Sequence, residues 1–180
     1  MRYLLGFIFI ILCFSGASQG LYQQSGIIHT EVQMYTKDGV QINGTSKEMH
    51  IELPDAGTKM VILLDPQTII TDNIEFNEEM DNAILGNFKF LAEVDVSAFE
   101  YQSRYNEMVE LASECEINNV TGNTVIQLVV NNKKTNSENI YIIVGKGEID
   151  IEEYNLHQVF PNLKGELKFQ FTQTIKVKYN

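Results

Sequence analysis

The stretch from Glu166 to Asn180 alternates between apolar and polar side chains for most of its length. Apolar residues hold odd positions and polar residues hold the even ones: Leu167, Phe169, Phe171, Ile175, Val177 and Tyr179 against Glu166, Lys168, Gln170, Thr172, Thr174, Lys176 and Lys178. Successive side chains of a strand point to opposite faces, so the pattern predicts one strand with an apolar and a polar face. At about 3.3 Å per residue it spans roughly 45–50 Å. A strand of that length predicts a large curved antiparallel sheet, and a barrel rather than a small sandwich.

Gln173 is the one polar residue on the apolar face of this predicted strand. One interpretation is that the strand ends or bulges at this residue. The other is that the amide makes a polar contact inside a cavity. Gln173 is therefore a candidate for an inward polar contact.

Seven further stretches have the composition of strands and are separated by turn residues, of which Asp38-Gly39 is a clear example. They begin near Ile28, Met49, Met60, Phe88, Val109, Ile126 and Ile140. The segment near residues 74–86 is less regular and is expected to form one or two helical turns or a long loop. In the helical form Met80, Ile84 and Leu85 point inward. The chain is thus predicted to be all-β, an antiparallel barrel or sandwich of about eight strands.

The stretch that begins at Ile140 changes the phase of its apolar residues. Ile140, Ile142 and Val144 have one parity, whereas Ile149 and Ile151 have the other. Gly145 and Gly147 stand between the two groups. We therefore expect a bulge or a sharp bend at these glycines.

The first twenty residues have the features of a signal peptide. Met1-Arg2 give a positive start, Leu4 to Phe14 form an apolar run, and small residues follow from Ser15 to Gly20. The run is too short to span a bilayer comfortably. We expect cleavage near Gly20, export to the periplasm or the medium, a single domain over residues 21–180, and no transmembrane segment after cleavage.

The mature chain is strongly acidic and contains a single cysteine. Since Arg2 is removed with the signal peptide, the mature chain has twelve basic and 24 acidic residues, which gives a net charge of −12. Such a charge argues against nucleic acid and against anionic membranes as partners. Cys115 is alone, so an internal disulfide is excluded. Its apolar parity predicts a small core residue, with an intermolecular disulfide as the alternative.

Motifs that would indicate catalysis or metal binding are missing from the sequence. The three histidines are scattered, and there is no H-E-x-x-H, C-x-x-C, EF-hand, G-x-S-x-G or phosphate-loop pattern. Glu48, His50 and Glu52 share one parity and could begin a metal site. A solvated polar face is the preferred interpretation, because such sites usually need more histidine or cysteine. We expect no catalytic residue, no metal and no cofactor.

In four places the chain resembles the YceI-like family, bacterial exported polyisoprenoid-binding proteins with an extended lipocalin-like barrel. The matching segments are Ile117 to Thr121 with Val125 to Leu128, Phe76 to Met80 leading to Phe88-Lys89-Phe90, Asp150 to Leu156 with its Tyr154-Asn155-Leu156, and the alternation from Glu166 to Tyr179. The family's His-Gly pair is Asn118-Asn119 here, and its aspartate-histidine signature before the long loop is missing.

The resemblance implies a lipocalin-like antiparallel barrel that holds an elongated apolar ligand, an isoprenoid-type lipid, without catalysing a reaction. Nine residues are expected to line its interior: Phe88, Phe90, Val94, Ile126, Leu128, Phe169, Phe171, Gln173 and Ile175. The alternative is a secreted structural or protein-interaction domain with a solid core and no small-molecule ligand. Each of the nine residues is then ordinary core. The sequence leaves the oligomeric state open.

Overall fold

The computed structural model describes residues 21–24, 28–52, 59–94, 107–134 and 138–178. The predicted signal peptide, residues 1–20, lies outside these ranges. The described chain contains eleven strands, two short helices and one 3₁₀ turn. In chain order these are β1 Leu21–Gln24, β2 His29–Thr36, β3 Gln41–Ser46, β4 Met49–Glu52, β5 Lys59–Leu64, the 3₁₀ turn η1 Pro66–Thr68, β6 Ile70–Thr71, α1 Ile74–Asn82, β7 Phe88–Glu93, β8 Val109–Ile117, β9 Val120–Lys134, β10 Glu138–Asp150, α3 Leu156–Val159 and β11 Leu163–Lys178.

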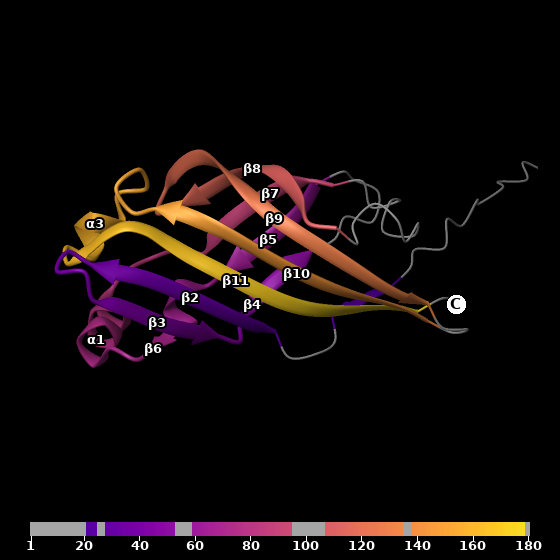
Figure 1. The fold of residues 1–180 in the computed structure, drawn as a ribbon, viewed down its shortest axis with the longest axis horizontal. Helices are drawn as coiled ribbons and strands as arrows, with labels where there is room; N and C mark the ends of the chain where they lie inside the picture. Colours follow the sequence, from indigo (N-terminus) through magenta and orange to yellow (C-terminus); the bar gives the residue numbers. More distant parts are fainter. Residues whose placement is uncertain (1–20, 25–27, 53–58, 95–106, 135–137, 179–180) are drawn as a thin grey trace, which may run out of the picture.

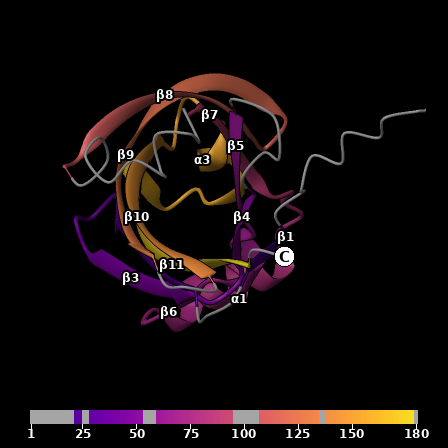
Figure 2. The same ribbon diagram turned by 90° about the vertical axis from the view of Figure 1, so that its right-hand side faces the viewer.

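The strands form one antiparallel sheet in the order β4-β5-β7-β8-β9-β10-β11-β2-β3-β6, and β1 pairs with the last part of β11. Viewed end-on, the sheet curls round a central axis (Figure 2). Helices α1 and α3 lie at one end, called here the helical end, and β11 ends at the other, called the carboxyl end (Figure 1). The predicted all-β, lipocalin-like barrel is thereby confirmed.

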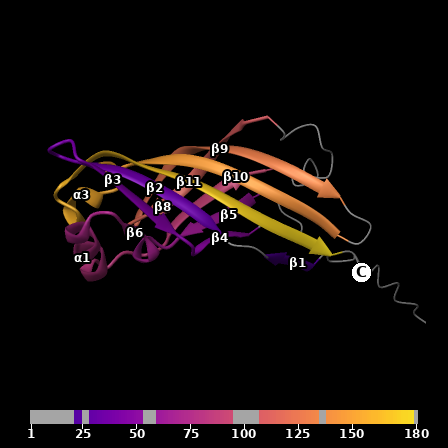
Figure 3. The same cartoon turned by 60° about the horizontal axis from the view of Figure 1, so that its bottom comes forward.

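Strands β9, β10 and β11 are the longest and run side by side along the molecule (Figure 3). As predicted, β11 keeps its odd residues buried and its even residues at least partly exposed from Glu166 onward. Val177 and Tyr179 belong to the predicted pattern but lie outside the side chains that the structure describes. This strand therefore sets the inner face of the barrel wall over most of its length.

The bulge predicted in β10 is wrong. This strand pairs with β11 in unbroken register from Glu138 to Asp150. Its odd residues are buried along the described length, including Tyr141, Ile143 and Ile149, whereas Ile142 is 39% exposed. The odd-numbered residues of β10 therefore point inward along the whole described strand.

Gly145 and Gly147 occupy inward positions of β10 because aromatic rings of β11 lie over them. A Cβ atom on Gly145 would collide with the ring of Phe171, and one on Gly147 would lie 2.6 Å from Cζ of Phe169. Real Cβ atoms do not approach other atoms so closely. The glycines thus make room for the rings without interrupting the strand.

A two-residue turn joins β8 to β9. Asn118 and Asn119 both have positive φ, 50° and 61°, and Ile117 pairs with Val120 across the turn. Two successive residues in the left-handed region are the requirement of a type I′ hairpin turn, and asparagine tolerates that region. The local sequence therefore determines this connection.

At the helical end, α1 is capped by Asn73, whose side chain accepts a hydrogen bond of 2.9 Å from the backbone N–H of Phe76. Phe76 packs its ring against Phe160 at 5.1 Å between centroids, and Met80 is buried as predicted. Ile84 was expected to point inward, but it is 96% exposed. The helix ends at Asn82, so its periodicity does not extend to this residue.

Candidate functional site

The inner face of the barrel is the site that the sequence predicts, and all nine proposed lining residues lie on it. None of the nine side chains is more than 3% exposed: Phe88, Phe90, Val94, Ile126, Leu128, Phe169, Phe171, Gln173 and Ile175. They come from β7, β9 and β11 and from Val94, which directly follows β7. Their contact with a ligand remains a prediction.

Four of these residues are brought together inside the barrel. Phe90 and Phe169 have ring centroids 5.1 Å apart, and Phe169 stacks on Phe171 at 6.4 Å. Ile126 also lies beside Phe169, because both approach the same face of Gly147. Gln173 and Ile175 follow along β11 towards the carboxyl end.

The inner face is closely filled by the protein's own side chains. A side chain that borders a void large enough for water would have accessible surface there, and the nine residues have almost none. A lipid chain can therefore occupy the barrel only if inner side chains rearrange. Met34, Met49 and Met60 belong to the same core and are unbranched, flexible side chains that adapt readily to new surroundings.

Apart from the cysteine and the tyrosines, four polar side chains are buried among the described residues, and two of them have partners. Thr30 donates a hydrogen bond to Sδ of Met49 at 3.4 Å, and Ser46 shares one of 2.6 Å with Thr68. Oγ of Ser113 and both amide atoms of Gln173 have no hydrogen-bond partner. Buried polar atoms without partners are uncommon and call for an explanation.

The bulge or strand end considered for Gln173 is wrong. Gln173 pairs with Ile143 within the unbroken register of β10 and β11, and it is only 1% exposed. Its amide therefore points into the barrel because the regular alternation of β11 places it there. The sequence identified the residue, but only the fold shows that its amide is left unpaired.

Cys115 is a buried free thiol, as its parity predicts. Its Sγ lies 2.8 Å from the hydroxyl oxygen of Tyr154, a contact that the sequence did not indicate. Burial raises the pKa of Cys115. Burial, followed by the hydrogen bond with the thiol, raises the pKa of Tyr154. Both groups stay protonated at neutral pH, which suits a structural contact rather than a nucleophile.

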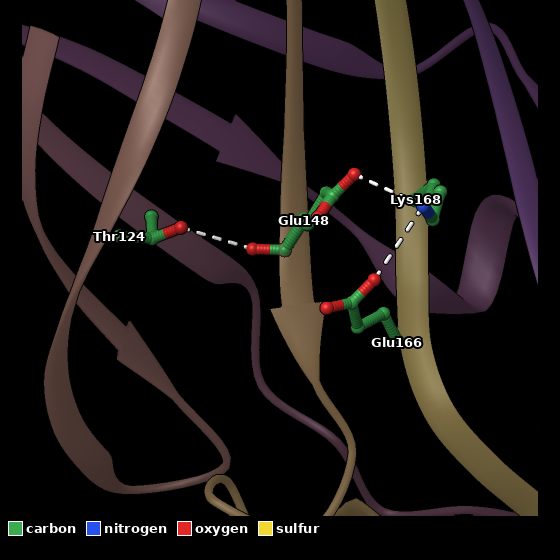
Figure 4. A network of polar contacts seen from close by, with 4 residues as sticks. All are labelled: Thr124, Glu148, Glu166 and Lys168. Atoms are coloured by element: carbon green, nitrogen blue, oxygen red, sulfur yellow. Dashed lines mark hydrogen bonds and ion pairs between the residues drawn. The ribbon is translucent and has the colours of Figure 1, made fainter.

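A hollow of about 1040 Å³ lies on the outer face of the sheet and is lined mostly by polar and charged side chains of β2, β3 and β8 to β11. Beside it Lys168 forms ion pairs with Glu148 at 3.1 Å and with Glu166 at 3.5 Å (Figure 4). Thr124 donates a hydrogen bond of 2.9 Å to the backbone carbonyl of Glu148. Glu148 is the main cause that raises the pKa of Lys168. Such a lining does not suit a long apolar ligand, and no sequence pattern indicates the hollow.

His50 does not begin a metal site within the described part of the chain. Its Nε2 lies 3.2 Å from Oε1 of Glu52, and both side chains are about half exposed. Among the residues described, no group of three or more histidine, cysteine, aspartate or glutamate side chains is placed to hold a metal ion. The helices in the same ranges are all too short or too polar to cross a membrane.

No protein-family model and no curated protein matches the sequence. Several solved structures resemble the fold, among them the following two. A polyisoprenoid binding domain from Saccharophagus degradans, implicated in plant cell wall breakdown, has a TM-score of 0.65 at 12% identity, over 88% of this chain and 99% of that domain. BcnA from Burkholderia cenocepacia has a TM-score of 0.56 at 9% identity, over 82% and 95% of the two chains. The chain thus has the barrel fold of this polyisoprenoid binding domain, which is the fold that the resemblance to the YceI-like family implied.

Proposed function

We propose that this protein is an exported, non-enzymatic binding protein that holds an elongated apolar molecule, of isoprenoid type, inside its barrel. The observation that carries the proposal is the apolar inner face of a barrel whose fold is shared with a polyisoprenoid binding domain. Transfer of a lipid chain from water onto such a face is driven by about 25 cal/mol per Å² of apolar surface removed from water. Residues 1–20 act in this proposal as a cleaved signal peptide.

The close packing of the inner face supports a second candidate function. If the side chains do not move apart, the barrel is a solid scaffold and its exposed surface binds a protein instead. The two candidates differ in one physical respect, namely whether the interior opens to a lipid chain. An experiment that reports contact at the interior therefore separates them.

The absence of tryptophan from the sequence makes such an experiment simple. In a Phe169→Trp variant the only indole is placed on the inner face, beside Phe90. In a Tyr35→Trp variant it is placed on β2 at an outward position, next to Gln41. Brominated lipids quench tryptophan fluorescence only on contact.

We expect a brominated isoprenoid lipid to quench the Phe169→Trp protein saturably and to leave the Tyr35→Trp protein largely unquenched. Circular dichroism of both variants checks that the fold is kept. Equal quenching of the two variants indicates surface adsorption, and no quenching of either favours the solid scaffold. Both results contradict the proposed function.

A further inference from the structure

We infer that the polar group of the bound lipid is an uncharged hydroxyl that hydrogen-bonds with the side-chain amide of Gln173. This inference rests on the proposed function and adds the chemical class of the ligand's polar end. It starts from the unpaired amide inside the barrel. Gln173 is 1% exposed, and neither Oε1 nor Nε2 has a hydrogen-bond partner.

The position of Gln173 suits the polar end of an elongated ligand. On β11 it is the next inward residue after Phe171, on the side of the carboxyl end. From there the inner face continues over Phe171 and Phe169 towards the helical end, where Phe76 and Phe160 pack together. A ligand whose hydroxyl meets Gln173 therefore lays its apolar chain along these aromatic rings.

The inner face of the described residues carries no charge that would suit a phosphorylated lipid. Apart from the cysteine and the tyrosines, the buried polar residues of the described chain are Thr30, Ser46, Ser113 and Gln173, and none of them is charged. A buried phosphate needs cationic partners, because moving an unpaired charge out of water is strongly unfavourable. Of the described residues, none supplies such a partner on the inner face.

Among uncharged lipid groups, the one that best complements Gln173 is decided by the donors and acceptors of its side-chain amide. Gln173 offers two N–H donors and one carbonyl acceptor. A hydroxyl accepts from Nε2 and donates to Oε1, so it can satisfy both atoms. A carbonyl or an ether only accepts and leaves Oε1 unpaired, and a hydrocarbon satisfies neither atom. A lipid alcohol is therefore the best complement.

The test compares three lipids that share one hydrocarbon chain: a long-chain prenol, its methyl ether and its diphosphate. Their binding is measured by displacement of a fluorescent lipid probe from the wild-type protein and from Gln173→Leu. Gln170→Leu, the same change at an outward position of β11, is the matched control. If Gln173→Leu fails to fold, Gln173→Met takes its place.

For the wild-type protein and for Gln170→Leu we expect the prenol to bind about tenfold more tightly than the ether, the size expected for one buried hydrogen bond. We expect the diphosphate to bind more weakly than the prenol. In Gln173→Leu the preference for the prenol over the ether disappears, because the leucine side chain offers neither a donor nor an acceptor.

Three results overturn the inference and leave the proposed function standing. They are diphosphate binding as tight as prenol binding, equal binding of prenol and ether to the wild-type protein, and an undiminished prenol preference in Gln173→Leu. If none of the three lipids displaces the probe from the wild-type protein, the proposed function itself is contradicted.

Discussion

Burial of the unpaired Gln173 amide lowers the free energy of unfolding, and a single substitution can measure by how much. Burial of an amide without hydrogen-bond partners costs about 1–3 kcal/mol in proteins. Both of its polar atoms are in that situation, between the apolar neighbours Phe171 and Ile175. An apolar residue of similar volume at this position avoids the cost.

We predict that Gln173→Leu raises the free energy of unfolding by about 1 kcal/mol, because it removes the unpaired amide from the core. The measurement is urea unfolding of lipid-free protein followed by circular dichroism. Gln170→Leu is the control, with a change within about 0.5 kcal/mol, as for other exposed positions. A Gln173→Leu protein that is less stable than this control contradicts the assignment of an unpaired amide.

The raised pKa values of Cys115 and Tyr154 predict how the free energy of unfolding depends on pH. Their pKa values are raised in the folded protein by burial, so the unfolded chain loses these protons at lower pH than the folded protein does. The folded protein then binds more protons, and the free energy of unfolding falls as pH rises. The fall begins near the ordinary thiol pKa, about 8.5, and steepens above about 10, where unfolded tyrosines ionise.

For the thiol the expected slope is at most about 1.4 kcal/mol per pH unit. Urea unfolding between neutral pH and pH 10 measures it, with Cys115→Ala as the matched variant. In that variant the part of the decline that begins near pH 8.5 should be absent. An identical pH profile for both proteins indicates that the thiol ionises as easily in the folded protein as in the unfolded chain.

At the scale of the elements, glycines of β10 pack against aromatic rings of β11. Phe171 lies over Gly145, and Phe169 lies over Gly147. The glycines let the two aromatic rings approach the backbone of β10 closely. The packing of the inner face therefore depends on these two positions.

We predict that Gly145→Ala lowers the free energy of unfolding by about 1–3 kcal/mol, because the new methyl group collides with the ring of Phe171. In Gly86→Ala the new methyl group meets nothing within 4 Å, so that control should be neutral or slightly stabilised. Combining Gly145→Ala with Phe171→Leu should restore part of the loss. Equal stabilities of the two alanine variants contradict the proposed close approach.

The same strands show what the sequence can and cannot predict. The alternation of β11 is visible in the sequence because its outer face is polar throughout. In β10 both parities carry apolar residues, and the inward positions of Gly145 and Gly147 look like interruptions. Their meaning depends on rings that β11 supplies, and this information is not local. Strands β1, β3 and β6 were not predicted, and in β3 only Ile42 is strongly apolar.

For the candidate site, parity predicted that the nine proposed lining residues point inward, and all nine are buried. It could not show that Phe90 and Ile126 meet Phe169, because these residues come from three strands far apart in the sequence. Nor could it show the contact of Cys115 with Tyr154, or the unpaired amide of Gln173. Each of these facts depends on the register between strands.

At the scale of the whole molecule, the sheet curls round a central axis, and short helices lie at one end (Figures 1 and 2). The side chains that face this axis are mostly apolar. The chain as a whole carries an acidic excess, and a net charge of that kind does not identify a partner. A function in lipid binding requires that the interior, closely packed by its own side chains, opens to receive a chain. The two proposed functions differ on this point alone.

The most direct test is the mass of the mature protein purified from its own host, measured by native mass spectrometry and followed by extraction with organic solvent. The proposed function predicts a near-stoichiometric apolar lipid, seen both as added mass and in the extract. An unliganded mass, together with no binding of a fluorescent lipid probe, would contradict it.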